Sequence, residues 1–198
     1  MSLPRFYPIF DSAAWIARAL PLGVRLVQLR IKDRPEDALR AEIARACDLC
    51  RRHGAILVVN DHWRLAIALG CDFVHLGQED LDGADLRAIR AAGLRLGLST
   101  HDEAELDRAL ACRPDYVALG PVWPTILKRM TWHPQGVERL TDWKARIGAI
   151  PLCAIGGLTP DRAQQAFAAG ADIAAAVTDI TLNPDPEARI RDWLRIAP

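Results

Sequence analysis

Cationic and amide side chains that could bind an anion are concentrated in the segment Arg25-Leu-Val-Gln28-Leu-Arg30-Ile-Lys32. Successive side chains of a strand point to opposite faces, so we expect Gln28, Arg30 and Lys32 to share one face. Two cations and an amide are costly on a face that should be apolar, unless an anionic group meets them. This segment therefore predicts binding of a phosphate or diphosphate.

Two carboxylates follow at the ends of later apolar runs. Asp61 comes directly after Asn60 in Ile56-Leu-Val-Val-Asn60-Asp61, and Asp80 closes the run His75-Leu-Gly-Gln-Glu-Asp80. Mg²⁺ prefers hard oxygen ligands and commonly uses one or two carboxylates together with substrate phosphates. For each aspartate the alternative is a helix N-cap, above all for Asp61, which precedes His62-Trp63. Taken with the cations, the two aspartates predict a diphosphate–magnesium site and hence an enzyme.

A third group of candidates lies in the connection from Gly120 to Gly136, the longest in the chain. Long connections in compact domains are usually lids or binding loops. Thr125 and Lys128 could donate to phosphate oxygens, the lysine as a point charge. We therefore expect this loop to contribute to substrate binding.

The elements that must position these residues alternate regularly along the chain. The expected strands are Phe6–Phe10, Leu26–Ile31, Ala55–Asn60, Phe73–Leu76, Leu94–Ser99, Tyr116–Leu119, Leu152–Ile155 and Ile173–Val177. The expected helices are Ala13–Leu20, Pro35–His53, Trp63–Leu69, Gly83–Ala92, Asp102–Cys112, Val137–Ile147, Pro160–Ala169 and Asp185–Ile196, with Thr100-x-x-Glu103 as a capping box.

Apolar strands that alternate with helices imply a parallel sheet covered by helices. The number of repeats fits a single-domain (β/α)8 TIM barrel over residues 1–198. A doubly wound open sheet is the alternative, weakened because no Gly-x-Gly-x-x-Gly follows the first strand. Active sites of (β/α)8 barrels lie at the C-terminal ends of the strands, where all the candidates above fall, as does Ser99.

The last two strands end in Gly156-Gly157 and Val177-Thr178. In a (β/α)8 barrel these positions form a recurrent phosphate site, built from glycine amides and the N-terminus of a short helix. We therefore expect a second phosphate group to bind near Gly157, Val177 and Thr178.

Composition narrows the function further. The 198 residues carry 25 basic and 25 acidic side chains, which argues against nucleic acid as a partner. The sequence has neither a membrane-length apolar stretch nor a signal pattern, so we expect a cytoplasmic protein. Cys47 and Cys50 form a CxxC inside an expected helix, where we interpret them as core-facing residues rather than half a zinc site.

Along essentially its whole length the chain resembles the thiamine-phosphate synthase family. The resemblance rests on Gln28-Leu-Arg30-Ile-Lys32, Asn60-Asp61, Val74-His-Leu-Gly-Gln-Glu-Asp80, Gly97-Leu-Ser99-Thr100-His, Gly120-Pro-Val-Trp-Pro-Thr125 with Lys128, and Ala154-Ile-Gly-Gly157. It implies the coupling of hydroxymethylpyrimidine diphosphate to a thiazole phosphate, which gives thiamine phosphate and pyrophosphate through a pyrimidine-methyl cation.

The resemblance also implies roles for individual residues. It places Asp61 and Asp80 on Mg²⁺ and makes Arg30, Lys32 and Lys128 the catalytic cations. Around the pyrimidine diphosphate it sets Gln28, Arg30, Lys32, Asn60, Ser99 and Lys128, and around the thiazole phosphate Thr125, Leu127, Gly157, Val177 and Thr178. The expected partners are these small-molecule substrates, with a homo-oligomer possible.

Two positions depart from the family pattern. Leu127 stands where the loop commonly has a second threonine, which removes a hydroxyl donor, and Thr178 replaces a serine. Two alternatives stay open: a thiazole tautomerase, which shares the fold without needing the metal–diphosphate residues, and a non-catalytic phosphate-binding barrel.

Overall fold

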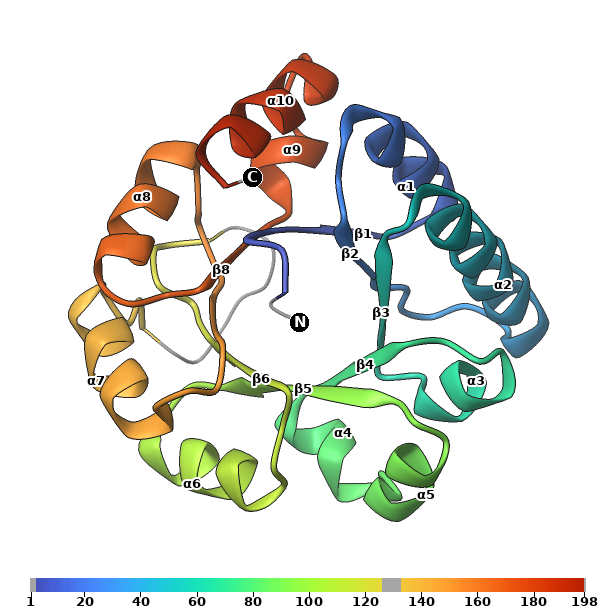
Figure 1. The fold of residues 1–198 in the computed structure, drawn as a ribbon, viewed down its shortest axis with the longest axis horizontal. Coiled ribbons are helices and arrows are strands. Elements are labelled where there is room, and N and C mark those ends of the chain that lie inside the picture. The colour runs from blue at the N-terminus through green and yellow to red at the C-terminus, as the bar shows by residue number, and fades with distance from the viewer. Residues whose placement is uncertain (1–2, 126–132, 198) are drawn as a thin grey trace.

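A computed structural model describes residues 3–125 and 133–197 of the chain (Figure 1). Its strands are β1 (Phe6–Phe10), β2 (Leu26–Leu29), β3 (Ile56–Asn60), β4 (Phe73–Leu76), β5 (Arg95–Thr100), β6 (Tyr116–Leu119), β7 (Leu152–Ala154) and β8 (Ile173–Ala176). Neighbouring strands are parallel, and β8 pairs with β1 to close the barrel. The predicted (β/α)8 TIM barrel is confirmed.

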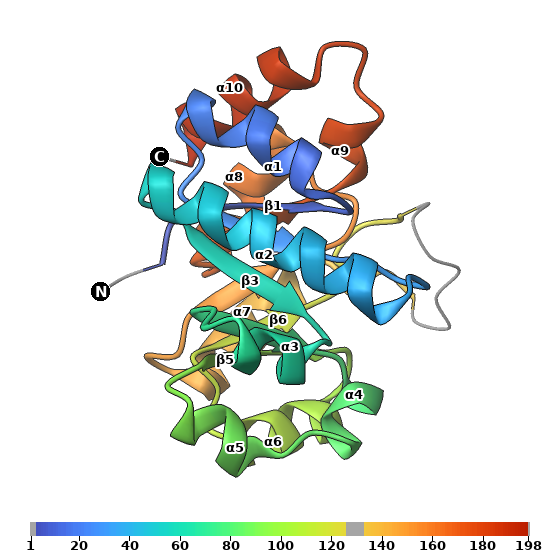
Figure 2. The same ribbon diagram turned by 90° about the vertical axis from the view of Figure 1, so that its right-hand side faces the viewer.

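Helices surround the barrel, as the view down its axis shows (Figure 1). They are α1 (Ala13–Ala19), the 3-10 turn η1 (Leu20–Leu22), α2 (Glu36–His53), α3 (Trp63–Ala68), α4 (Gln78–Asp82), α5 (Leu86–Ala91), α6 (Glu103–Ala111), α7 (Glu138–Ile147), α8 (Pro160–Ala168), α9 (Thr178–Thr181) and α10 (Pro186–Ile196). The short helices α4 and α9 lie toward the right in Figure 2, the side to which the β3 arrow points.

The buried apolar residues form two separate cores. The larger one lies between the strands and the surrounding helices and includes the fully buried Trp143 and Trp193. The smaller one fills the barrel interior with Tyr7, Ile9, Leu26, Val58, Phe73, Tyr116, Ala118, Cys153, Ile173 and Ala175. Because strand side chains alternate between the two faces, every strand except β5 supplies both cores; β5 gives Leu96 and Leu98 to the larger core only.

Several expected boundaries move. β2 ends at Leu29 instead of Ile31, so Arg30 and Lys32 follow the strand and do not share a strand face with Gln28. The expected helix Gly83–Ala92 begins only after Asp85, whose carboxylate caps α5. α4 and α9 were not predicted, because helices of five and four residues carry too little periodicity to be recognised.

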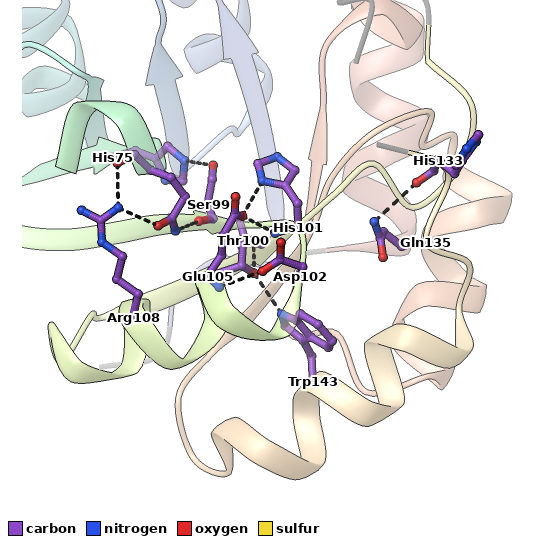
Figure 3. Close-up of polar contacts among 12 residues, drawn as sticks. His75, Ser99, Thr100, His101, Asp102, Glu105, Arg108, His133, Gln135 and Trp143 are labelled. Atoms are coloured by element: carbon purple, nitrogen blue, oxygen red, sulfur yellow. Dashed lines mark hydrogen bonds and ion pairs between the residues drawn. The ribbon is translucent and has the colours of Figure 1, made fainter. Parts of the chain in front are cut away.

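The expected capping box at Thr100 is wrong. Thr100 is the last residue of β5, and its buried hydroxyl donates to the Ala118 carbonyl at 3.0 Å. The α6 cap is instead Asp102, whose carboxylate accepts from the Glu105 amide at 2.8 Å. Glu105 in turn accepts from the amide of His101, the residue before the cap, so a variant of the capping box forms two residues later (Figure 3).

The cysteines of α2 are core residues, as expected. Cys47 and Cys50 are both buried, and the Cys47 sulfur lies 3.0 Å from that of Cys71 on the segment before β4. Across residues 3–125 and 133–197 no three His, Cys, Asp or Glu side chains gather in a way that could hold a metal. None of the helices in these ranges is long and apolar enough to cross a membrane.

Candidate active site

Polar residues from successive strands meet at the C-terminal end of the barrel. Asn60 is the last residue of β3, Ser99 is the penultimate residue of β5, and Asp80 lies in α4 directly after β4. The register aligns Asn60 with His75, and Ser99 with Ala118. Closure of the sheet therefore brings together side chains that are far apart in sequence.

Two carboxylates and a cation form the most polar part of this end. The Lys32 Nζ donates to Asp61 Oδ2 at 2.7 Å. The pKa of Asp80 is raised by burial first, and then by the charge of Asp61 and a hydrogen bond between the two carboxyl groups. Lys32 and the Gly77 amide oppose this rise. The predicted metal ligands Asp61 and Asp80 are therefore neighbours.

The backbone at Asp61 rules out the alternative assigned to it. Asp61 adopts φ 62°, a left-handed conformation, and the residue that precedes α3 as its cap is His62. His62 makes no side-chain cap bond, while its Nε2 lies 3.1 Å from the Ile31 carbonyl oxygen. The left-handed turn leaves the Asp61 carboxylate beside Lys32 and Asp80.

This pair fits Mg²⁺ by its chemistry. Two hard carboxylates lie close enough to share a hydrogen bond, and their mutual repulsion adds to the effect of burial in raising the pKa of Asp80. A divalent cation between them would remove that repulsion. The protein offers two oxygen-bearing side chains here, which matches the preference of Mg²⁺ for one or two carboxylates and substrate phosphate oxygens.

Arg30 follows directly after β2 and has no ion-pair partner within the described ranges, 3–125 and 133–197. Its backbone amide donates to the Phe10 carbonyl at 2.8 Å, which fixes the position of the residue just beyond β2. The Arg30 charge also contributes to lowering the pKa of His75, so the guanidinium lies close to that ring. An uncompensated arginine of this kind is suited to an anionic ligand.

Below these charges, five side chains form a hydrogen-bonded row across the barrel interior, which we call the polar row: Gln28, Tyr7, Tyr116, His75 and Ser99. Gln28 Nε2 donates to Tyr7 Oη at 2.8 Å, and the two tyrosine oxygens are 2.9 Å apart. His75 Nδ1 lies 2.7 Å from Tyr116 Oη, and its Nε2 lies 2.8 Å from Ser99 Oγ. Figure 3 shows the last of these contacts.

The predicted ligand-binding residue Gln28 thus points into the barrel, where it is 2% exposed. Sequence reasoning missed Tyr7, His75 and Tyr116 as parts of the site. The one available signal was a histidine in the otherwise apolar strand β4, opposite the small residue Gly97 of β5.

Burial controls the protonation of the polar row. It lowers the pKa of His75 to about 4, an effect that Asp61 opposes and Arg30 reinforces. Burial also raises the pKa of Tyr7 and of Tyr116 well above the ordinary tyrosine value. All three side chains are therefore neutral near pH 7.

Gly97 makes room for this arrangement. A Cβ atom at Gly97 would overlap the ring of Tyr116. The Tyr116 ring stacks on His75, with centroids 5.5 Å apart and an interplanar angle of 17°. Only glycine at this position lets the tyrosine lie flat over β5.

The helix α4 connects the side of the site that holds Asp80 to Ser99. Gln78, its first residue, donates from Nε2 to the Ser99 carbonyl at 2.6 Å. Arg108 of α6 donates to the Gln78 carbonyl at 3.2 Å and forms an ion pair with Asp82. These bonds position the helix that carries Asp80.

The loops after β6 and β7 pack against each other. Val122 and Trp123 amides donate to the Ile155 and Gly156 carbonyls at 2.9 and 3.1 Å. Gly157 has φ 64°, and a Cβ there would overlap the Pro124 carbonyl oxygen. The predicted phosphate residues Gly157 and Thr125 therefore belong to adjoining loops.

At β8 the predicted phosphate residues lie at the start of a helix. Val177 is the N-cap residue of α9, and Thr178 is the first residue of that helix. The short helix α9 therefore follows β8 at the position of the recurrent phosphate site of (β/α)8 barrels. Leu127 and Lys128 lie outside the described residues, and their predicted roles stay predictions.

Comparison with known proteins agrees with the sequence resemblance. A family model described as "Thiamine monophosphate synthase" matches residues 7–180. The thiamine-phosphate synthase of Rhizobium etli is 66% identical over 194 residues, which cover 98% of this chain and 95% of the relative. The Escherichia coli thiamine-phosphate synthase is 50% identical over 191 residues, covering 96% and 90%.

The fold agrees as well. The solved structure of a thiamine phosphate pyrophosphorylase from Pyrococcus furiosus superposes with a TM-score of 0.85 at 27% sequence identity. The superposition covers 97% of this chain and 94% of that chain.

Proposed function

The chain belongs to the thiamine monophosphate synthase family and is a transferase of thiamine phosphate synthesis, and from this premise we propose how its residues bind the two substrates and assist their coupling. The substrates are hydroxymethylpyrimidine diphosphate and a thiazole phosphate. The bond between the pyrimidine methylene carbon and the diphosphate oxygen breaks, and the electron pair leaves with pyrophosphate. The thiazole nitrogen then forms the new bond to that carbon.

The observation that carries the proposal is the group formed by Lys32, Asp61 and Asp80. The 2.7 Å ion pair and the two adjacent carboxylates make a site where a cation and a diphosphate can bind together. When bound there by Asp61 and Asp80, Mg²⁺ supplies positive charge that neutralises the departing pyrophosphate. Arg30 and Lys32 bind the diphosphate oxygens and stabilise the same developing charge. Lys128 is the third cation of this set.

The pyrimidine diphosphate also contacts Asn60 and Ser99 in this proposal, at the ends of β3 and β5. Gln28 acts one layer deeper, because its amide donates to Tyr7 inside the barrel. The ring of the substrate then lies above the polar row, where the dry barrel interior keeps water from capturing the pyrimidine-methyl cation.

The thiazole phosphate binds across the β6, β7 and β8 loops. Gly157 lies against the β6 loop, and its left-handed backbone could not be adopted easily by another residue. Amides near Gly157 and around Val177 and Thr178 hold the phosphate, together with Thr125 of the facing loop. Leu127 is assigned to the same phosphate by the family resemblance alone. Thr178 retains the hydroxyl of the serine that it replaces.

A thiazole tautomerase is the second candidate of the same fold. It has no need of paired carboxylates beside a lysine, and the names of the relatives favour the synthase. Action in the cytoplasm and assembly into a homo-oligomer stay predictions.

One assay tests the proposal. The protein is incubated with both substrates and Mg²⁺, and thiamine phosphate and pyrophosphate are measured in parallel. We expect equal amounts of the two products, and none in excess chelator. Asp61→Asn serves as the matched control, since it keeps the shape of the side chain and removes the charge. Thiazole isomerisation without coupling would support the tautomerase instead.

A further inference from the structure

The direction of hydrogen donation along the polar row is set by its buried end. Gln28 Nε2 is a donor only, so the Tyr7 oxygen accepts from it. Among residues 3–125 and 133–197, the hydroxyl of Tyr7 has two hydrogen-bond partners, Gln28 and Tyr116. Since Tyr7 is 1% exposed and a buried donor needs an acceptor, its hydrogen goes to Tyr116.

The same direction of hydrogen donation continues from Tyr116 to Ser99. Tyr116 Oη accepts from Tyr7 and gives its own hydrogen to His75 Nδ1, 2.7 Å away. A neutral imidazole has a single N–H, which is then at Nε2 and is donated to Ser99 Oγ at 2.8 Å. Ser99 has accepted a hydrogen and keeps its own for another partner. With Gln28 Nε2 turned toward Tyr7 Oη, as it is here, the reverse direction would leave the Tyr7 hydrogen without an acceptor inside the barrel.

We propose that the polar row fixes His75 as the Nε2–H tautomer and turns Ser99 into a hydrogen-bond donor toward the ligand. Tyr116 and His75 are then positioning residues, which act through Ser99. The ligand atom that meets Ser99 must be an acceptor, such as a diphosphate oxygen or a ring nitrogen of the pyrimidine, and not its amino group. This last step rests on the proposed function, whereas the tautomer does not.

The tautomer is measured on the free protein. Two-bond ¹H–¹⁵N correlation spectra of histidine-labelled protein at neutral pH distinguish the protonated from the bare ring nitrogen, and His75→Gln identifies the signals of His75. We expect Nε2 to carry the hydrogen. A dominant Nδ1–H form would overturn the proposal, whatever reaction the enzyme catalyses.

Variants locate the residue that sets the tautomer. In Tyr116→Phe the imidazole of His75 loses the hydroxyl that donates to its Nδ1. Ser99 can then either accept a hydrogen bond from His75 Nε2 or donate one to it, so both tautomers of His75 should appear. In Ser99→Ala the upstream bonds persist, and Nε2–H should remain. A single unchanged tautomer in Tyr116→Phe contradicts the assignment, as does a switch to Nδ1–H in Ser99→Ala. The serine variant also serves if the phenylalanine variant does not fold.

Thr100→Val is the matched control. Thr100 follows Ser99 on β5 and is fully buried on the other face, where it accepts from Trp143 Nε1 at 2.9 Å (Figure 3). Its loss removes a buried polar contact next to the polar row without touching the row itself. We expect lower thermal stability and an unchanged His75 tautomer. A shift of the His75 tautomer in this variant would mean that a general loosening of β5 can change the tautomer without the loss of any hydrogen bond of the polar row.

Binding of the pyrimidine diphosphate with Mg²⁺, measured by calorimetry without the thiazole substrate, tests the link to the ligand. Ser99→Ala should weaken binding by roughly ten-fold or more, as expected for a lost hydrogen bond to a charged group. Tyr116→Phe should weaken binding by at least about two-fold, since half of the molecules would then present the wrong form.

The double variant separates positioning from a structural role. If Tyr116 acts through Ser99, then Tyr116→Phe should cost nothing further once Ser99 is alanine. An equal loss in both backgrounds would overturn the positioning role. If the His75 tautomers are as expected but Ser99→Ala does not change binding of the pyrimidine diphosphate, Ser99 does not contact this ligand. That result would refute the assignment of Ser99 to the substrate and would leave the hydrogen-bond direction in the polar row unaffected.

Discussion

The Lys32 ammonium lies 2.7 Å from Oδ2 of Asp61, yet the two side chains differ in exposure, at 51% and 12%. An ion pair with an exposed partner contributes only about 0.2–1 kcal/mol to stability. The contact therefore explains little of the fold. It keeps a cation beside two carboxylates, where we propose that the diphosphate binds together with Mg²⁺.

Lys32→Met should separate binding from stability. We expect the free energy of unfolding to change by less than about 1 kcal/mol. The KM for the pyrimidine diphosphate should rise roughly ten-fold or more, since a hydrogen bond to a charged group is lost. Lys32→Arg is the control that keeps the charge. If denaturant titration showed a loss of several kcal/mol instead, Lys32 would be a structural residue.

Asp80→Asn should make the metal-free protein more stable and less active. The pKa of Asp80 is raised in the fold, mainly by burial and by Asp61, so the charged form is disfavoured relative to the unfolded chain. That penalty is present at neutral pH and disappears as the pH falls through the usual carboxyl range. Asparagine removes it, so the Tm at pH 7 should rise.

The affinity for Mg²⁺ is a second test of the Asp80 carboxyl group. Mg²⁺ must displace the proton of Asp80, so the affinity for Mg²⁺ should begin to fall at a higher pH than for an ordinary aspartate. In Asp80→Asn we expect a metal affinity lower by at least about 10–100-fold, the cost typical of a lost supporting partner. Calorimetry at several pH values measures both effects, and an unchanged affinity would exclude Asp80 as a ligand.

Arg30→Ala should act on the pyrimidine substrate alone. Because no ion pair of Arg30 exists in residues 3–125 and 133–197, the fold should keep its stability. Loss of a charge-assisted hydrogen bond costs about 1.5–3 kcal/mol, so the affinity for the pyrimidine diphosphate should fall by at least ten-fold. Arg30→Lys tests whether two parallel bonds are needed. Unchanged affinity in a folded Arg30→Ala protein would contradict the assignment.

The loop that carries Leu127 and Lys128 offers two matched changes. Lys128→Ala should lower the single-turnover rate more than substrate affinity, because its charge assists pyrophosphate departure. Leu127→Thr restores the hydroxyl of the family pattern and should tighten thiazole-phosphate binding by about 0.5–1.5 kcal/mol. A wild-type single-turnover rate in Lys128→Ala would refute the role of this lysine.

Gly97→Ala should distort the polar row from outside it. The added Cβ would overlap the Tyr116 ring, and overpacking of this kind typically costs about 1–3 kcal/mol. Because the ring also stacks on His75, we expect the histidine signals to shift as well. Thermal unfolding and the His75 spectrum measure the two effects. An alanine variant of native stability would mean that the tyrosine can move without cost.

The sequence predicted the barrel because each strand is a distinct apolar run between amphipathic helices. The sequence also predicted that Asp61, Asp80 and Ser99 lie at the C-terminal end of the strands, where the structure has them. The strand pattern failed at Arg30 and Lys32, since β2 ends at Leu29 and the alternation of faces ends with it. A strand boundary depends on pairing with its neighbours, which the local pattern does not contain.

The polar row could not be predicted for a related reason. Tyr7, Gln28 and His75 belong to different strands, and each alone is compatible with an ordinary buried position. Their contacts follow from the register, in which Ile9 pairs with Gln28 and His75 pairs with Gly97. Closure of the barrel, and not any single segment, turns separate polar residues into one hydrogen-bonded set.

The run from His75 to Asp80 joins three tasks within six residues. Its first residue, His75, joins Tyr116 to Ser99 in the polar row, Gln78 donates to the Ser99 carbonyl, and Asp80 lies beside Asp61. Insertion or deletion of one residue here would move Asp80 about 100° around the first turn of α4, or invert His75 across β4. We therefore expect the length of this run to tolerate no change, even where side chains such as Glu79 can be replaced freely.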